Sequence, residues 1–372
     1  MIDASNGPPQ LPLDLSASAL LYLPRIPVIH AAGELRPSNH TWRRIGPIPG
    51  IPETSVLKGF ALISLGDCVY VIGGRLCQRS EPGRDDDADV DPVEVDVAVR
   101  TEVLRYNIRT EEWSSCAQLI APRFDFACAA CYGKIYAAGG QCMLSAVSGA
   151  HRWTATAEVY DPSRDQWAAL PDMSTPRYKC VAVTWEGRFH VVGGFTPERE
   201  CLAGLLERSS AEAYDEGRSK WDLFPGMWQL DVPPNQIAAV GGRLLSSGDC
   251  LNTWKGQVEA YDGKLKIWNI VERSQLPDLS SLLITHDAAC DDQEGPSRPS
   301  RRLNYLTLAP VGTRLYFLAG YQRSSTGCSY IWAVHTFDTE PDDQTGEPWT
   351  SFEPTEEDVD KELCSHCCVA QL

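Results

Sequence analysis

The chain has 372 residues, with 50 acidic and 33 basic side chains and a formal net charge of −17 at pH 7. That charge argues against nonspecific binding to nucleic acid or to an anionic membrane surface. Residues 1–19 lack the basic start and apolar core of a signal peptide, and no apolar run is long enough to span a bilayer. With no export signal, the fourteen cysteines favour a reducing compartment, so we expect the cytosol or the nucleus.

One pattern recurs four times along the chain: Tyr followed by Trp seven residues later. The pairs are Tyr106 and Trp113, Tyr160 and Trp167, Tyr214 and Trp221, and Tyr261 and Trp268. Successive pairs are 54, 54 and 47 residues apart, and a glycine pair precedes the second and third copies at the same spacing. A period near 50 residues indicates a repeat architecture, which grows by adding units rather than separate cores.

Each unit is expected to be a four-stranded sheet. In the unit 123–171 the strands are predicted at 124–131, 134–138, 157–160 and 167–170. The first is an apolar run of small side chains, as an inner strand covered on both faces requires. Tyr132-Gly133 forms the turn after it, and Gly139-Gly140 ends the second strand where neighbouring groups approach the backbone. Tyr160 and Trp167 are predicted to be packing residues that fill the wedge between units.

These motifs resemble the kelch repeat, whose units are the blades of a β-propeller. The resemblance covers nearly the whole chain and implies an all-β, six-bladed propeller after a flexible tail at residues 1–19. Five blades are expected at 56–119, 120–171, 174–225, 234–271 and 302–352. The fourth is degenerate, with Gly248-Asp249 in place of a glycine pair.

The sixth blade must be assembled from both ends of the chain, as 20–46 plus 361–372. Residues 32–42 align with 157–167, which superposes Trp42 on Trp167, and residues 20–23 supply the earliest strand. Residues 364–372 have the small, apolar character of the other inner strands. We expect this C-terminal inner strand to close the ring together with the N-terminal strands and to leave no open sheet edge.

Two clusters could in principle carry chemistry. Cys364, His366, Cys367 and Cys368 are metal-like, but a strand would point Cys367 away from the others, and no second ligand pair is suitably spaced. Residues 286–292 hold one His, one Cys and three Asp within a Ser-, Asp- and Pro-rich stretch typical of a flexible loop. The residues that galactose oxidase and the plant specifier proteins use for metal chemistry have no counterpart here. The sequence therefore predicts no enzyme, no metal and no cofactor.

Arginines recur at one position of the repeat. Arg123, Arg177 and Arg302 each stand ten residues before a turn glycine. Since every inner strand begins on one face of the disc, we expect them to be semi-exposed and to ring the channel mouth, where guanidinium groups suit carboxylates and phosphates. In kelch substrate receptors of ubiquitin ligases the matching arginines contact acidic motifs, so the resemblance implies binding of an acidic or phosphorylated segment, with Phe124 and Tyr178 beside it. The alternative is that each Arg caps a strand or pairs with a local acid.

The resulting interpretation is a monomeric, non-enzymatic module that binds a partner protein through its loop face. It resembles the plant F-box/kelch proteins, which recruit substrates to a ubiquitin ligase, but only about twenty residues precede the first strand, too few for an F-box. The alternative is a small-molecule binder or enzyme that uses the central channel. Acidic residues crowd 81–96 on the same face; this stretch is either a solvated loop or a competitor for an acidic partner.

Overall fold

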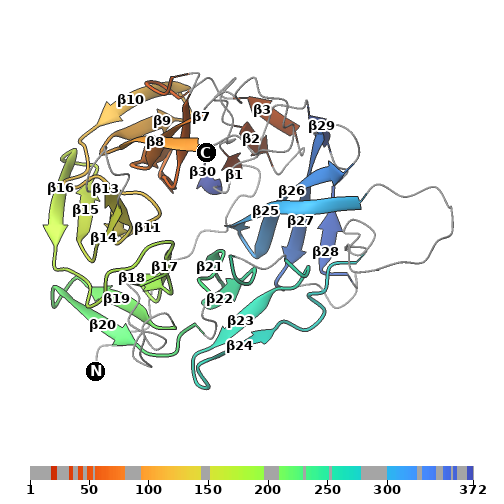
Figure 1. Ribbon diagram of the computed structural model, residues 1–372. Coiled ribbons are helices and arrows are strands. Elements are labelled where there is room, and N and C mark those ends of the chain that lie inside the picture. The colour runs from red at the N-terminus through yellow and green to blue at the C-terminus, as the bar shows by residue number, and fades with distance from the viewer. Residues whose placement is uncertain are drawn as a thin grey trace, which may run out of the picture.

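The computed structural model describes fifteen ranges of the chain, and every regular element within them is a β-strand. The ranges are 18–22, 33–36, 41–44, 48–52, 55–79, 94–143, 151–196, 209–228, 232–250, 254–277, 300–324, 329–340, 347–352, 355–357 and 367–371. Six antiparallel sheets lie around a common centre (Figure 1). We number five of them, sheet 1 to sheet 5, in chain order, and call the sixth the terminal sheet.

The strands of the first three numbered sheets follow the chain from the centre outward. Sheet 1 contains β5 (Ala61–Leu65), β6 (Cys68–Ile72), β9 (Val103–Asn107) and β10 (Glu112–Cys116). Sheet 2 contains β11 (Ala127–Cys131), β12 (Lys134–Ala138), β15 (Ala157–Asp161) and β16 (Gln166–Leu170). Sheet 3 contains β17 (Val181–Trp185), β18 (Arg188–Val192), β19 (Ala211–Asp215) and β20 (Lys220–Phe224).

The remaining sheets include two small ones that extend the repeat. Sheet 4 contains β21 (Ile237–Val240), β22 (Arg243–Ser246), β23 (Glu259–Asp262) and β24 (Ile267–Ile270). Sheet 5 contains β25 (Ser300–Val311), β26 (Arg314–Ser324), β27 (Ser329–Asp338), β28 (Trp349–Ser351) and β29 (Thr355–Glu357). The terminal sheet contains β30 (Cys367–Gln371), β1 (Ser18–Tyr22), β2 (Gly33–Arg36) and β3 (Thr41–Arg44). The small sheets are β4 (Ser55–Lys58), β7 (Arg75–Arg79) and β8 (Glu94–Val99), and β13 (Gln141–Met143) with β14 (His151–Trp153).

The four strands predicted in residues 123–171 are confirmed in sheet 2. β12 has the predicted bounds, and β15 and β16 are each one residue longer than expected. β11 begins at Ala127 rather than at residue 124, because Asp125 has a positive φ of 52° that interrupts an extended chain. Phe124 instead makes an isolated bridge to Gln141, beyond the glycine pair.

The repeated aromatic pairs lock neighbouring sheets together, as expected for packing residues. The Tyr160 and Trp167 rings lie 5.2 Å apart, and equivalent contacts recur in sheets 1, 3 and 4. Four Trp indoles also donate a hydrogen bond to the preceding sheet, whereas the buried Nε1 of Trp113 has no partner among the described residues. The Nε1 donors and carbonyl acceptors are Trp167 to Ala117, Trp221 to Pro171, Trp268 to Met227 and Trp349 to Ser274, at 2.7–3.0 Å. One side chain therefore supplies both apolar burial and a directional bond across the junction.

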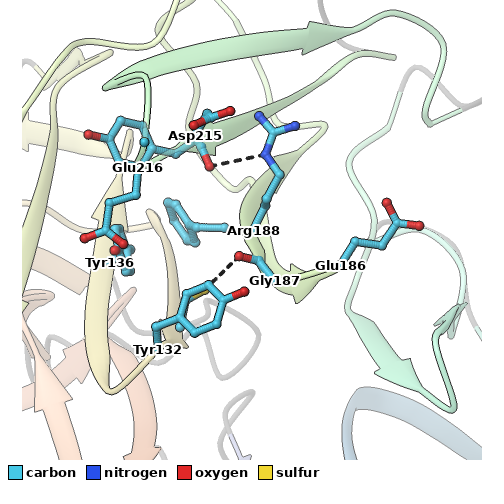
Figure 2. A pocket seen from close by; sticks show the side chains of 11 residues that line it. Tyr132, Tyr136, Glu186, Gly187, Arg188, Asp215 and Glu216 are labelled. Atoms are coloured by element: carbon cyan, nitrogen blue, oxygen red, sulfur yellow. Dashed lines mark hydrogen bonds between the residues drawn. The ribbon is translucent and has the colours of Figure 1, made fainter. Parts of the chain in front are cut away.

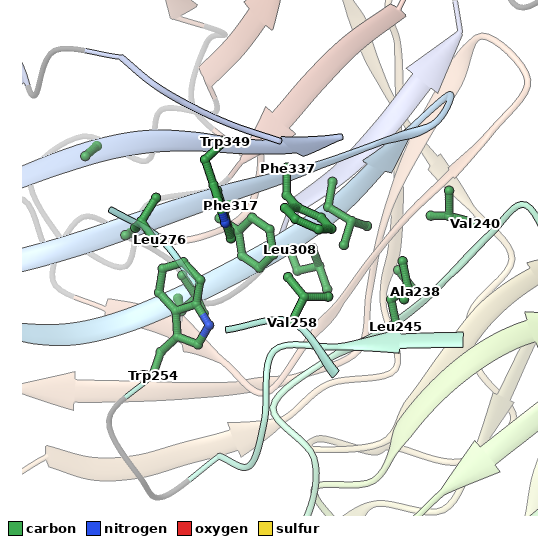
Figure 3. Close-up of a cluster of buried hydrophobic side chains, with 14 residues drawn as sticks. Ala238, Val240, Leu245, Trp254, Val258, Leu276, Leu308, Phe317, Phe337 and Trp349 are labelled. Atoms are coloured by element: carbon green, nitrogen blue, oxygen red, sulfur yellow. The ribbon is translucent and has the colours of Figure 1, made fainter. Parts of the chain in front are cut away.

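A large apolar cluster joins sheets 4 and 5 (Figure 3). Trp254 enters it from the connection after β22 and stacks on Phe317 of β26, with ring centroids 5.0 Å apart. Trp349 and Phe337 pack against the same group, so this junction keeps the Tyr–Trp arrangement with Phe in place of Tyr. The substitution explains why the period is harder to recognise in this part of the sequence.

The terminal sheet pairs strands from both ends of the chain. β30 pairs with β1 in antiparallel register, from Ser18 opposite Gln371 to Tyr22 opposite Cys367. β30 also contacts β25 and β5, the inner strands of sheets 5 and 1. The first strand, β1, begins within the tail expected at residues 1–19, because Ser18 and Ala19 belong to it. Cys364 and His366 lie outside the described residues.

Candidate partner-binding face

The inner strands of the numbered sheets begin on one face of the molecule, here called the loop face; the turns after them lie on the opposite turn face. β12 returns to the loop face at Gly139-Gly140, and the chain then continues there as the hairpin β13–β14. In sheet 1, β7 and β8 form the corresponding hairpin, and β7 also pairs with β4. Only the end of the expected acidic loop is described, and it is a strand: residues 94–96 belong to β8, while residues 81–93 lie outside the described part of the chain.

Glycine is required where β12 meets the loop face. Gly140 has a φ of 94°, and a Cβ there would lie 2.7 Å from the carbonyl oxygen of Phe124. Its amide donates to the carbonyl of Arg177 in the next sheet, at 2.6 Å. The glycine pair therefore serves both the close approach of the strand start and the junction to the neighbouring sheet.

Three aromatic side chains, here called the aromatic stack, lie side by side on the loop face over sheets 2 and 3. The rings of Trp153 and Tyr178 are nearly parallel, with an interplanar angle of 3° and centroids 5.6 Å apart. Phe195 contacts Tyr178 from the other side at 5.3 Å, and the two residues form an isolated β-bridge. All three are only partly buried. Beside them Thr196 is 3% exposed, and its hydroxyl has no hydrogen-bond partner among the described residues.

A second group joins the β7–β8 hairpin to sheet 2. The Arg75 guanidinium lies 4.8 Å from the centroid of the Phe124 ring and pairs with Asp96 at 2.5 Å. The Cys77 thiol also donates to Asp96, and burial raises its pKa to about 12, so this thiol stays protonated and unreactive at neutral pH. Phe124, which the sequence suggested as a partner contact, is buried under Arg75. Tyr178 remains accessible.

Arg123 is enclosed within sheet 2. Its side chain is 1% exposed, and its Nη2 lies 2.6 Å from Oε1 of Glu158 on β15. Nη1 donates to the carbonyl oxygens of Gly139 and Thr156, at 2.8 and 3.0 Å. The second carboxylate oxygen of Glu158 accepts the amide of Ile120, at 2.7 Å. Both charged groups are thus hydrogen-bonded on several sides, as burial of an ion pair demands.

Arg177 repeats the arrangement in sheet 3. Its side chain has no exposed area and pairs with Glu212 of β19 at 3.3 Å. Further bonds run to the carbonyl oxygens of Gly193 and Ser210 and to the Ser210 hydroxyl, at 3.0, 3.2 and 2.6 Å. The Ser174 amide donates to Glu212 as Ile120 does to Glu158.

The expectation that Arg123 and Arg177 are semi-exposed at the channel mouth is therefore wrong. Each side chain turns into its own sheet because a glutamate on the third strand, thirty-five residues downstream, offers a buried carboxylate. This spacing was visible in the sequence as a second periodic signal, since Glu158 and Glu212 are 54 residues apart like the arginines. Arg302 lies within β25, and nothing is described of its side chain. Partner binding by the three arginines stays a prediction.

The other numbered sheets fill the same positions differently. Strand register places Leu104 of sheet 1 where sheet 2 has Glu158, and Leu57 stands in the place of its arginine. Sheet 4 keeps a glutamate, Glu259, without an arginine, and burial together with nearby Asp249 raises the pKa of Glu259. In sheet 5 the position belongs to His335, whose ring is buried and 2.8 Å from the Ser351 hydroxyl. Burial lowers the pKa of His335 to about 4, which keeps it neutral at physiological pH.

Two exposed cations are sequence neighbours of the aromatic stack: Lys179 follows Tyr178, and Arg152 precedes Trp153. Lys179 has a φ of 51°, and its amide donates to the carbonyl of Asp125 in the preceding sheet. Asp125 is bonded to Gly59 in the same way, which links the starts of three inner strands. Because these exposed cations lack the enclosure of Arg123 and Arg177, they are positive charges that a partner can reach.

Within the described ranges, no group of three or more His, Cys, Asp or Glu side chains is arranged to hold a metal ion. The same ranges contain no helix of the length and hydrophobicity needed to cross a membrane.

With this geometry in view, comparison with known proteins is informative. The Kelch motif matches residues 122–174, which are sheet 2 and its junctions. The chain contains a kelch repeat. It is 31% identical over 171 residues to the F-box/kelch-repeat protein At1g16250 of Arabidopsis thaliana, covering 46% of this chain and 39% of the relative. It is 28% identical over 246 residues to the F-box/kelch-repeat protein OR23 of the same plant, covering 59% of this chain and 53% of the relative.

A human protein is similar over a longer stretch. Kelch-like protein 21 of Homo sapiens is 26% identical over 280 residues, covering 65% of this chain and 40% of the relative. The chain thus spans between 39% and 53% of the length of these three relatives. The resemblance to plant F-box/kelch-repeat proteins inferred from the repeated motifs is confirmed.

Proposed function

We propose that this chain is a six-bladed kelch propeller that binds a partner protein through its loop face and catalyses no reaction. The terminal sheet would be the closing blade. Pairing of β30 with β1, and the contacts of β30 with both β25 and β5, support that proposal. A closed ring holds the loop-face residues of several blades on one rigid support, which lowers the entropic cost of binding.

The aromatic stack is the observation that carries this function. Trp153, Tyr178 and Phe195 come from different segments, yet their rings form one partly exposed surface. Tyr and Trp supply large contact areas with few rotatable bonds, and they are enriched among the residues that dominate binding energy. The unpaired Thr196 hydroxyl beside them offers a hydrogen bond that a partner could complete.

We propose a partner segment that is acidic or phosphorylated. Lys179 and Arg152 flank the aromatic stack and are exposed, so they can meet carboxylates or a phosphate while apolar groups pack on the rings. A part for Arg123, Arg177 and Arg302 in this contact would require the first two to leave their buried glutamates. The names of the F-box/kelch-repeat relatives favour a link to ubiquitin ligation as the setting for such recognition.

The test is quantitative affinity capture from the native cell, with tagged wild-type protein and the variant Trp153→Ala/Tyr178→Ala. The double variant should capture about tenfold less of each partner, or less still, which corresponds to a loss of about 1.4 kcal/mol of binding free energy. Phe224→Ala removes an exposed aromatic ring from the outer strand β20 and serves as the matched control. Unchanged capture by the double variant, with its fold intact by circular dichroism, would contradict the proposal. If the protein instead binds or converts a small molecule in its central channel, the alternative of a small-molecule binder or enzyme is favoured.

A further inference from the structure

A pocket of about 270 Å³ lies on the turn face, between sheets 2 and 3 (Figure 2). Tyr136 and Phe189 form its apolar base, with stacked rings 5.4 Å apart. Tyr132, in the turn after β11, covers one side and is 75% exposed. Glu186, in the turn after β17, and Glu216, in the turn after β19, stand at the rim. The pocket is on the side of the molecule opposite the aromatic stack.

Two residues at this pocket adopt a backbone conformation that their side chains disfavour. Tyr132 and Glu186 are the first residues of equivalent turns in sheets 2 and 3, with φ of 48° and 49°. The equivalent residue in sheets 1, 4 and 5 is glycine, at Gly66, Gly241 and Gly312, each with φ between 56° and 60°. Glycine takes this conformation at least cost, so its absence from two neighbouring turns indicates a use for the side chains themselves.

These side chains frame the entrance. The Tyr132 hydroxyl lies so close over Gly187 that a Cβ on that glycine would be 2.1 Å away. Glu186 stands on the other side of Gly187 (Figure 2). Gly187, which lacks a side chain, therefore leaves room for the Tyr132 ring to lie across the junction of the two sheets.

The charges around the pocket leave one carboxylate uncompensated. Glu216 is paired with Lys134 at 2.7 Å, and Arg218 bridges Asp215 and Asp222. Arg188, the cation among the lining residues, is also paired with Asp222, at 2.7 Å. Among the described residues Glu186 has no ion-pair partner. The rim therefore combines an unneutralised carboxylate with an exposed aromatic ring, two features that attract a cation.

We propose that this pocket binds one basic side chain, Lys or Arg, of a partner protein, by contact with the Tyr132 ring and attraction to Glu186. Pockets for drug-sized ligands usually exceed about 300 Å³, so a volume of about 270 Å³ suits a single side chain better than a whole small molecule. This site is independent of the loop face, and a basic segment bound here would be distinct from the acidic segment proposed there.

The experiment titrates the full chain with N-acetyl-lysine N-methylamide and N-acetyl-arginine N-methylamide, followed by ligand-observed NMR. We expect both basic probes to bind saturably, with a dissociation constant in about the millimolar range that rises with salt concentration. The neutral norleucine analogue and acetate should not bind. Tyr132→Gly and Glu186→Gly should each weaken binding by about fivefold. Both variants install the residue of the other sheets, so they should fold and melt at a temperature no lower than that of the wild type.

Glu111→Gly is the matched control. Glu111 is also an acidic residue at positive φ, 60°, but it lies in the outer turn of sheet 1, away from the pocket. Its replacement should leave binding of the lysine probe unchanged, as should Trp153→Ala on the loop face. The proposal is overturned if the wild type shows no saturable binding of either basic probe, or if norleucine or acetate binds as well. Equal binding by the two pocket variants and the control would also overturn it.

Discussion

Replacing the buried ion pair of sheet 3 distinguishes a structural arginine from a partner-binding one. In Arg177→Leu the Glu212 carboxylate keeps its burial and loses its guanidinium; in Glu212→Leu the guanidinium is left unpaired. Breaking a buried pair by removing one partner costs about 3–5 kcal/mol. We therefore expect each single variant to lose about that much of its free energy of unfolding.

The double variant Arg177→Leu/Glu212→Leu copies the apolar Leu57 and Leu104 of sheet 1. Replacing a buried pair by apolar residues is often neutral or stabilising by about 1–4 kcal/mol. Here the carbonyl oxygen of Gly193 and the amide of Ser174 lose the partners that Arg177 and Glu212 supply, at about 1–3 kcal/mol for each group left unsatisfied, whereas the Ser210 carbonyl oxygen still accepts the Gly193 amide. We expect the double variant to lie above both singles, with a coupling energy of about 2 kcal/mol or more.

Urea unfolding, followed by tryptophan fluorescence, measures these free energies. If Arg177→Leu unfolds within about 1 kcal/mol of the wild type, the guanidinium is not needed by the fold, and the reasoning fails. The double variant also separates the two roles of the arginine. If the folded double variant still captures the partner, binding does not depend on Arg177. If it folds but no longer captures the partner, Arg177 takes part in binding.

Four further outcomes are expected. Deleting residues 364–372 removes β30, so the truncated protein should aggregate or melt far below the full chain in calorimetry; a melting temperature within a few degrees would contradict closure of the ring. Because the pKa of His335 is lowered to about 4, the native state binds fewer protons than the unfolded state below about pH 6.5. Its contribution should thus reduce stability as pH falls from about 6.5 to 4, by about 3 kcal/mol in total, and His335→Leu should flatten that part of a pH series of urea titrations. Gly140→Ala should destabilise by about 2 kcal/mol or more in urea unfolding, through a clash with the Phe124 carbonyl and a positive φ; Gly133→Ala, with open space around it, is the control and should cost less. Excising residues 85–93, which leaves the Asp96–Arg75 pair intact, should strengthen binding of an acidic partner at low salt in a titration; equal affinity means that this segment does not compete.

Much of the architecture could be predicted from the sequence, because the same turn and packing residues recur at equivalent positions of several repeats. The turn at Tyr132-Gly133 and the Tyr160–Trp167 pair predicted the strands of sheet 2 to within a few residues. The small apolar run near the C-terminus likewise predicted a strand, and β30 has that place beside β1. Local periodicity sufficed here because strands, turns and wedge-filling rings depend on neighbours close in the repeat.

The candidate site was less predictable. Tyr178 is partly exposed, and its role in binding stays a prediction; the sequence could not show that Phe124 lies beneath Arg75 or that Trp153 stacks on Tyr178. These contacts depend on hairpins that leave the sheets after the glycine pairs, and β7 and β8 were expected to belong to a loop. Residues 80–93 separate β7 from β8, so no short turn motif in the sequence indicates that the two strands pair.

By itself, the sequence determined that four-stranded antiparallel sheets repeat along the chain and that Tyr and Trp side chains pack where they meet. Only the tertiary structure decided where Arg123 and Arg177 point. A guanidinium on a long, flexible side chain can reach either the channel mouth or the sheet interior, and composition favours neither. The buried carboxylates of Glu158 and Glu212 decide the direction, because leaving either one without its guanidinium would cost about 3–5 kcal/mol.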